Sequence, residues 1–294
     1  MNDAIDNLIK QQVELALLED VGPGDITTLA CIETCDISAE IVAKSDGIVA
    51  GIDLAKAAFL HFNKKINLTI GKSDGSKFVR GDRIITITGN SQAVLMAERT
   101  ALNFLGHLSG IASLTAQFVK KVEGTSVKIL DTRKTTPGLR YLEKYAVTCG
   151  GGVNHRFGLY DMALIKDNHI SAAGSISTAV KKMKEFLQSN DYRTKFAIPP
   201  EEIEIEVEIK NEKELREAID CGVKRILLDN QTPDSLKTLV NIARQMNKKL
   251  VLEASGNVKL DNVRAIAESG VDLISIGALT HSAISSDFSL KVIE

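Results

Sequence analysis

The sequence contains no tryptophan, and aromatic residues make up only 4% of its 294 positions. It also lacks a strong charge of either sign, because its formal net charge is −2. Proteins that bind nucleic acids without sequence preference combine a basic surface with aromatic side chains on which bases stack. We therefore predict that nucleic acid is not a partner of this chain.

Cysteine is scarce as well, and long apolar runs are missing. The four cysteines (Cys31, Cys35, Cys149 and Cys221) form neither a CxxC pair nor a zinc-type Cys/His cluster, so we expect reduced and mostly buried thiols. No apolar stretch approaches the length of a membrane span, and the opening MNDAIDNLIKQQ lacks the apolar region of a signal peptide. These features predict a cytoplasmic protein that does not bind membranes.

The first part of the chain predicts a small mixed α+β region. Apolar residues recur at helical spacing over 4–18, and this helix should end at the glycines and proline of EDVGPGDITT. DISAEIVA alternates polar and apolar residues, as a half-buried strand does. The remaining predicted elements are a helix at 53–62, strands at 66–70 and 83–88, and two helices at 91–104 and 108–122.

From residue 127 the pattern changes to alternating strands and helices. The strand-like runs are VKILDT, MALIKD, IEIEVEIK, RILLDN, KLVLEAS and DLISIG, and helix-like segments lie at 173–188, 211–220, 232–246 and 260–269. Alternating βα units with short links imply parallel strands, and this number of units favours a β/α barrel. The segment DYRTKFAIPPEE at 191–202 interrupts the pattern and is predicted to be a loop insertion.

Polar residues follow each of these strands at its C-terminal end. Any one of them could be a helix cap or a solvated loop charge. In a β/α barrel, however, catalytic groups lie where the C-terminal strand ends converge, so six similar strand ends predict a site. The residues are Asp131, Arg133, Lys134, Lys166, Asp167, Asn168, Glu208, Lys210, Asp229, Asn230, Glu253, Ser255, Asn257 and Ser275.

The run IEIEVEIK places Ile and Val on one face of its strand and Glu204, Glu206, Glu208 and Lys210 on the other. If the apolar face packs on helices, the carboxylates point toward the barrel axis and require cations or a metal. The stretch 131–169 has six Lys/Arg and is predicted to supply these cations. The alternative is an edge strand whose glutamates face water.

Two late loops and a glycine run add further signals. EASGN (253–257) and SIGA (275–278) each lie between a strand and a helix, where small residues let backbone N–H groups approach a phosphate. GGGVNHRF (150–157) is either a flexible connection or an open backbone that presents His155 and Arg156 to a carboxylate. Together the residues predict a small substrate with phosphates and carboxylates, and Mg²⁺ at Glu208 and Asp229.

At this point the motifs are recognisable. AERTALNFLGHLSGIAS, DTRKTTPGLRYLEKYAVTCGGGVNHRFGLYDMALIKDNH, EIEVEI, ILLDN, EASGN and ISIGALTHS together resemble the quinolinate phosphoribosyltransferase family, and the resemblance extends back to LLEDVGPGDITT. It implies transfer of phosphoribose from phosphoribosyl pyrophosphate to quinolinate, giving nicotinate mononucleotide, CO₂ and pyrophosphate in de novo NAD biosynthesis. It also implies an incomplete parallel β/α barrel at 109–279 and an N-terminal α/β sandwich at 1–108, with 280–294 packed on the sandwich.

The resemblance further implies roles for individual residues and a homodimer with shared active sites, which could assemble further. Arg99, Arg133, His155, Arg156 and Lys166 would bind the two carboxylates of quinolinate, with Arg99 reaching the neighbouring subunit's site. Lys134 and Lys166 would face the pyrophosphate, and Glu208 and Asp229 would hold Mg²⁺ and the ribose hydroxyls. The 5′-phosphate would lie against Ser255, Gly256, Asn257, Ser275, Ile276 and Gly277.

Three other functions stay open at this point. One is a Schiff-base lyase with Lys134 or Lys166 as nucleophile, although lysines among arginines suit anion binding better. Another is a related phosphoribosyltransferase that acts on a different aromatic carboxylate. The third is a non-catalytic phosphosugar-binding protein, which should have lost Glu208, Asp229 or the basic residues.

Overall fold

The computed structural model describes residues 3–293. The chain forms two compact units, the first of residues 1–116, 142–151 and 282–294, the second of 117–141 and 152–281. The sequence placed the boundary at 108/109, whereas the first unit extends to residue 116 and also includes 142–151. Within residues 3–293 we find no helix that is both long and apolar enough to cross a membrane.

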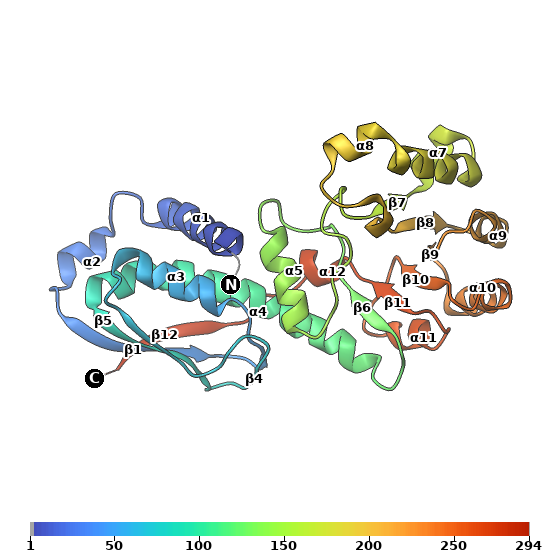
Figure 1. Cartoon of the computed structure of the whole chain (residues 1–294). Coiled ribbons are helices and arrows are strands. Elements are labelled where there is room, and N and C mark those ends of the chain that lie inside the picture. The colour runs from blue at the N-terminus through green and yellow to red at the C-terminus, as the bar shows by residue number, and fades with distance from the viewer. Residues whose placement is uncertain (1–2, 294) are drawn as a thin grey trace. The chain divides into compact units, whose positions relative to one another are not determined.

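The first unit is built on an antiparallel sheet with the strand order β12-β1-β5-β3. The alternation in DISAEIVA buries Ala39, Ile41 and Ala43 on one face. Figure 1 shows α1 and α3 on the same side of this sheet. The elements are α1 (Asp3–Asp20), α2 (Ile26–Cys31), β1 (Asp36–Ala43), β2 (Gly47–Ile48), α3 (Ile52–Phe62), β3 (Asn67–Ile70), β4 (Lys77–Phe78), β5 (Arg83–Asn90), α4 (Ser91–Lys121), α5 (Arg140–Cys149) and β12 (Phe288–Ile293).

The prediction of two helices at 91–104 and 108–122 was wrong, because α4 is a single helix of 31 residues. Gly106 and Gly110 do not break it but let neighbouring backbone approach closely. A β-carbon at Gly106 would lie 2.8 Å from the carbonyl oxygen of Ser286, and one at Gly110 would lie 2.3 Å from that of Ile284. The glycines of this segment therefore allow close packing. From the sequence pattern alone, this role could not be distinguished from ending a helix.

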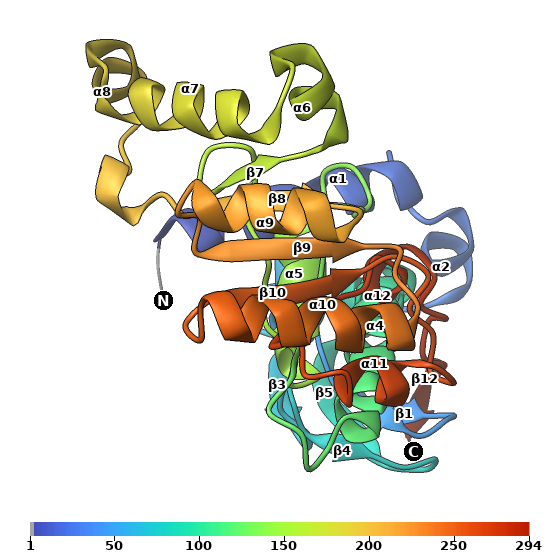
Figure 2. The same cartoon turned by 90° about the vertical axis from the view of Figure 1, so that its right-hand side faces the viewer.

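The second unit contains a six-stranded parallel sheet with the order β6-β11-β10-β9-β8-β7. Figure 2 shows α9, α10 and α11 along its outer side. No pairing joins β6 to β7 among the described residues, so the predicted incomplete β/α barrel is confirmed. The elements are β6 (Lys128–Leu130), β7 (Ala163–Ile165), α6 (Asp167–Ala173), α7 (Ile176–Gln188), α8 (Asn190–Lys195), η1 (Pro200–Glu202), β8 (Ile205–Ile209), α9 (Glu212–Asp220), β9 (Arg225–Asp229), α10 (Pro233–Met246), β10 (Val251–Ser255), α11 (Val263–Ala267), β11 (Leu273–Ser275) and α12 (Ala278–His281).

Two smaller predictions were also wrong. The segment 191–202 is not a plain loop, because most of it forms α8 and the short 3₁₀ helix η1. Ser189 caps α8 by accepting the N–H of Tyr192, whose buried ring stacks on Phe196 at a centroid distance of 4.9 Å. The thiols are not mostly buried either, since Cys31 and Cys35 are exposed.

The glycine packing of α4 can be tested by replacing Gly110 with alanine. Helix propensity alone favours alanine by about 1 kcal/mol, but the new methyl group would collide with a backbone carbonyl. We expect Gly110→Ala to destabilise the protein by about 1–3 kcal/mol and to lower the Tm by several degrees. Asn103→Ala, at an exposed position of the same helix, should leave the Tm unchanged or raise it. An equal or higher Tm for Gly110→Ala, measured by calorimetry, would contradict the packing role.

Candidate active site

A pocket with a volume of about 740 Å³ opens at the C-terminal ends of the parallel strands. Asp229, Ser255 and Ser275 are the last residues of β9, β10 and β11, so the chain leaves the sheet at this rim. The pocket size is typical of small-molecule sites. Fifteen residues singled out from the sequence line it: Arg133, Lys134, His155, Arg156, Lys166, Glu208, Asp229, Asn230, Glu253, Ser255, Gly256, Asn257, Ser275, Ile276 and Gly277.

Arg99 is the one residue with a predicted substrate or metal role that does not line this pocket within the described structure, and the strand-end residues Asp131, Asp167, Asn168 and Lys210 do not line it either. Arg99 lies on α4 in the first unit, where its side chain is exposed. The role of Arg99 in binding substrate in the site of a second subunit therefore stays a prediction.

Arg133 and Arg156 form the basic side of the pocket and repel each other. Burial lowers the pKa of Arg156, and the nearby charge of Arg133 lowers it further. Fixed contacts hold the pair in place: Arg156 donates to the carbonyl of Met162 at 3.1 Å, and Arg140 donates to the carbonyl of Arg133 at 3.4 Å. The pocket thus keeps two guanidinium groups ready for an anion.

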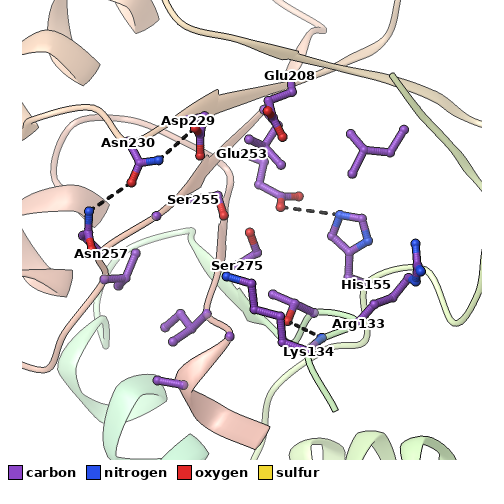
Figure 3. A pocket seen from close by; sticks show the side chains of 18 of the residues that line it. Arg133, Lys134, His155, Glu208, Asp229, Asn230, Glu253, Ser255, Asn257 and Ser275 are labelled. Carbon is purple, nitrogen blue, oxygen red and sulfur yellow. Dashed lines mark hydrogen bonds and ion pairs between the residues drawn. The ribbon is translucent and has the colours of Figure 1, made fainter. Parts of the chain in front are cut away.

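Lys134 approaches the same pocket from the side of β11, and Figure 3 shows it beside Ser275 while Arg133 lies toward His155. Its carbonyl accepts the hydroxyl of Thr280 at 2.7 Å. Gly277 makes room for its side chain, because a β-carbon there would lie 2.9 Å from Cδ of Lys134. The glycine of the SIGA loop therefore allows a lysine to reach the site.

Glu208 and Asp229 form the acidic side of the pocket, and Lys166 lies beside Glu208. Burial raises the pKa of Glu208, the charge of Lys166 opposes that rise, and Asp229 adds to it. Nζ of Lys166 lies 3.6 Å from the Glu208 carboxylate. Mg²⁺ in phosphate-transfer sites is commonly held by one or two carboxylates together with substrate phosphates. Two carboxylates that face one pocket fit that requirement.

The loop after β10 forms a strained cradle with the loop after β9. Gly256 and Asn257 have φ values of +94° and +51°, and Asn230 has +52°. A β-carbon at Gly256 would lie only 2.2 Å from the Asn230 side chain. Asn257 donates to Asn230 at 3.1 Å, and Asn230 donates to Asp229 at 2.8 Å (Figure 3). These contacts connect the predicted phosphate loop to the acidic side of the pocket.

Beneath the rim lies a buried ion cluster. Arg225, at the start of β9, donates to Glu206 at 3.1 Å and also contacts Glu253, and both carboxylate side chains are 0% exposed. Burial raises the pKa of Glu206 to about 7 and also raises that of Glu253, and Arg225 opposes both shifts. Of the glutamates of IEIEVEIK, Glu206 is buried and Glu208 lines the pocket, as the sequence predicted, whereas Glu204 is half-exposed. The source of the cation was predicted wrongly for Glu206, because Arg225 lies outside 131–169.

His155 lines the pocket and also contacts the two glutamates of this cluster. Its Nε2 lies 3.2 Å from Glu206 and 3.5 Å from Glu253, and its Nδ1 accepts the backbone N–H of Arg156 at 2.7 Å. His155, Glu206 and Glu253 are also the only three-residue set in the described chain whose metal-ligating atoms lie within 4.8 Å of one another. The arrangement is thus either an ionic network or a metal site.

Sequence reasoning missed several residues that line or support the site. Asn230 was noted at a strand end but given no role, and Lys259 and His281 were not selected although both line the pocket. Arg225 carried one signal, since a charged residue opens an otherwise apolar strand. For Lys259 and His281 we find no local pattern that separates them from ordinary surface residues.

Two family models cover nearly the whole chain. Residues 111–291 match Quinolinate phosphoribosyl transferase, C-terminal domain, and residues 25–109 match Quinolinate phosphoribosyl transferase, N-terminal domain. The meeting point of the two matches, near residue 110, lies inside α4.

Curated relatives and solved structures agree with these matches. A probable carboxylating nicotinate-nucleotide pyrophosphorylase from Bacillus subtilis is 42% identical over 284 residues, covering 97% of this chain and 93% of the relative. The chloroplastic enzyme of the same name from Arabidopsis thaliana is 40% identical, covering 97% and 82%. The structure of the nicotinate-nucleotide pyrophosphorylase from Francisella tularensis has a TM-score of 0.89 at 40% identity, covering 98% of this chain and 96% of that one. The chain therefore belongs to the quinolinate phosphoribosyltransferase family, as its motifs predicted.

Proposed function

We propose that this protein transfers phosphoribose from phosphoribosyl pyrophosphate to quinolinate and releases pyrophosphate, CO₂ and nicotinate mononucleotide in NAD biosynthesis. The observation that carries the proposal is the pocket itself, which brings two guanidinium groups, three lysines, three carboxylates and a glycine-asparagine cradle into one cavity. Both substrates are polyanions, so cations are needed before they can meet. Family membership and the names of the relatives support the same reaction.

The basic side of the pocket suits the two adjacent carboxylates of quinolinate. Arg133 and Arg156 can each fork onto a carboxylate, and Lys166 would contact both quinolinate and phosphoribosyl pyrophosphate. We propose that these groups, with Arg99 from a second subunit, orient the ring nitrogen toward the ribose. His155 lines the same pocket, although both of its ring nitrogens already have protein neighbours.

The acidic side and the cradle suit phosphoribosyl pyrophosphate. Lys134 and Lys166 would bind the pyrophosphate, and Ser255, Gly256, Asn257, Ser275, Ile276 and Gly277 would surround the 5′-phosphate. Glu208 and Asp229 would hold Mg²⁺ and the ribose hydroxyls. The metal, when bound, would stabilise the charge that develops on the departing pyrophosphate.

The reaction then follows from these positions. The quinolinate nitrogen forms a bond to C1 of the ribose while the C1–O bond breaks and its electron pair leaves with pyrophosphate. Fixed cations around that oxygen stabilise the developing charge without reorganisation. The ring nitrogen is now positively charged, so the carboxylate at the adjacent carbon can leave as CO₂. The electron pair left on that carbon accepts a proton from solvent.

Substrate choice tests the proposal directly. With Mg²⁺ and phosphoribosyl pyrophosphate, quinolinate should yield nicotinate mononucleotide. Nicotinate, which lacks one carboxylate, should have a kcat/KM lower by on the order of a hundredfold or more, because charge-assisted hydrogen bonds contribute about 1.5–3 kcal/mol each and each factor of ten corresponds to about 1.4 kcal/mol. Phthalate, which lacks the nitrogen, should inhibit competitively without reacting. Equal turnover of nicotinate and quinolinate in steady-state kinetics would refute the dicarboxylate site.

The acidic pair can be tested separately. Glu208→Ala and Asp229→Ala should reduce kcat strongly and leave the affinity for quinolinate nearly unchanged, because these carboxylates face the metal and the ribose. Asp167→Ala, next to Lys166 but paired with Lys210 on the exposed surface, is a control that should change kcat little. If both site variants lost quinolinate affinity in calorimetric titrations as much as they lost turnover, the assignment would be wrong.

We also propose a homodimer in which each pocket receives Arg99 of the second subunit, since Arg99 is exposed and does not line the pocket of its own second unit. Such dimers could assemble further. A cytoplasmic location is proposed as well, and the exposed thiols of Cys31 and Cys35 favour it because the cytosol keeps thiols reduced.

Subunit mixing tests the shared site. Arg99→Ala and Arg156→Ala should each be nearly inactive alone, whereas a mixture of the two chains should recover part of the activity because a hybrid dimer contains one intact site. Mixing Arg133→Ala with Arg156→Ala is the control and should recover none, because both residues belong to the same pocket. Absence of recovery in the first mixture, after mass spectrometry has confirmed subunit exchange, would place Arg99 in its own chain's site.

The other functions have less support. A Schiff-base lyase would need a lysine in apolar surroundings, but Lys134 and Lys166 line a pocket with arginines and carboxylates. A non-catalytic phosphosugar-binding protein would not need Glu208, Asp229 and the basic set together. Borohydride trapping with a carbonyl substrate would reveal a Schiff base directly.

A further inference from the structure

His155 is surrounded by protein groups at both of its ring nitrogens. Nδ1 accepts the backbone N–H of Arg156 at 2.7 Å, so it carries no hydrogen in this arrangement. The one hydrogen of the neutral ring is then on Nε2, which lies 3.2 Å from Oε2 of Glu206 and 3.5 Å from Oε1 of Glu253. Both ring nitrogens therefore lie close to protein groups, Nδ1 to the backbone N–H of Arg156 and Nε2 to two carboxylates.

The two carboxylates divide their oxygens between His155 and Arg225. Oε1 of Glu206 and Oε2 of Glu253 accept from Arg225. The other two oxygens, Oε2 of Glu206 and Oε1 of Glu253, are buried and have no hydrogen-bond partner within the described residues. They are the same atoms that face Nε2 of His155 (Figure 3 shows the Glu253 contact). Since an unsatisfied buried oxygen is costly, His155 is strongly held by this pair.

The hold on His155 extends to Arg156 and the pocket. The backbone N–H of Arg156 is fixed by the ring, and its guanidinium is fixed by the carbonyl of Met162. Arg156 needs such support because Arg133 repels it. On the other side, the backbone N–H of His155 donates to the buried carboxylate of Asp131 at 2.8 Å. The ring therefore joins the ion cluster inside the sheet to an arginine at the rim.

We propose that His155 is a positioning residue, held through Glu206 and Glu253 by Arg225, and that it presents Arg156 to a substrate carboxylate instead of binding that carboxylate itself. This rests on the proposed dicarboxylate site. It assigns a part in substrate binding to Arg225 and Glu206, which do not line the pocket.

The proposal predicts an effect opposite to that of simple Coulomb attraction. Removing a negative charge beside the pocket should strengthen the binding of a dianion, yet Glu253→Gln should weaken it, because the amide cannot serve both His155 and Arg225. The matched control is Glu204→Gln, which removes a half-exposed carboxylate that binds Arg225 at 3.2 Å and is not in contact with His155. The Glu204→Gln variant should bind phthalate within about twofold of the wild type, because a half-exposed ion pair contributes little and Arg225 keeps both buried carboxylates.

A double-mutant cycle separates positioning from direct binding, with the Kd of phthalate measured by calorimetry. His155→Asn keeps an acceptor for the Arg156 N–H but is too short to reach the carboxylates. His155→Asn and Glu253→Gln should each raise the Kd of phthalate by about tenfold. The double variant should have a Kd no higher than that of the weaker-binding single variant, as expected for coupled groups. The affinity for phosphoribosyl pyrophosphate should stay within about twofold, which general destabilisation would not achieve. Weakening by His155→Asn alone, with Glu253→Gln like the wild type, would overturn the proposal in favour of direct binding.

Two measurements do not depend on substrate. In imidazole ¹⁵N spectra of the wild-type protein, with His155→Asn used for assignment, the proposal requires a hydrogen on Nε2 and none on Nδ1. A hydrogen on Nδ1 would overturn it, even if the variants fail to fold. Elemental analysis of the purified protein should find no stoichiometric metal that Glu253→Gln removes, and such a metal would make the three groups ligands instead. If the wild type fails to bind both phthalate and quinolinate, the proposed function fails, while the spectra still decide the state of His155.

Discussion

Repulsion among like charges is the constraint on which the site depends. One pocket is lined by Arg133, Lys134, Arg156 and Lys166. These cations repel one another, so in the absence of an anionic ligand other protein groups must hold them in place. The structure meets this constraint with neutral carbonyls and a few carboxylates. Arg140 braces the backbone at Arg133, the Met162 carbonyl holds Arg156, and Glu208 lies beside Lys166. Because these contacts exist before substrate binds, little reorganisation is needed when charge develops.

Inside the sheet the charges that repel one another are negative. Glu206 and Glu253 are removed from water, and Arg225 brings a full positive charge to both of them. Buried ion pairs are weak evidence for stability, because desolvation offsets much of the attraction. Their geometry is nevertheless specific, since each carboxylate has one oxygen toward Arg225 and one toward His155. Such an arrangement fixes orientation more than it adds stability.

Small residues determine how closely the backbone can approach other groups, both in the site and in α4 of the first unit. Gly256 lies against Asn230, and Gly277 lies against Lys134. In α4, Gly106 and Gly110 contact the segment that leads into β12. In the similar protein of known structure from Francisella tularensis, the whole fold superposes with a TM-score of 0.89. The backbone paths that these glycines permit are therefore part of a fold that this chain shares with a protein 40% identical in sequence.

Much of the second unit could be predicted from local pattern. The parallel strands each appear as apolar runs, and the strand-end rule located ten of the residues that line the pocket, because parallel strands in one sheet end at the same rim. The helix break in α4 and the loop at 191–202 were predicted wrongly because glycine and proline have several local uses, and only neighbours distant in sequence decide among them. Arg225 was overlooked for the same reason, since its partners lie on two other strands.

The sequence by itself determined the family, the number of parallel strands and the chemical types of group at their ends, because these depend on residue identity and on the two periodicities of strand and helix. The tertiary structure decided which charges meet. It paired Glu206 with Arg225 instead of with the basic stretch, placed Lys166 beside Glu208, and directed both nitrogens of His155 toward protein groups. Charge pairing depends on distances of a few ångströms between residues far apart in the chain, and no local pattern records those distances.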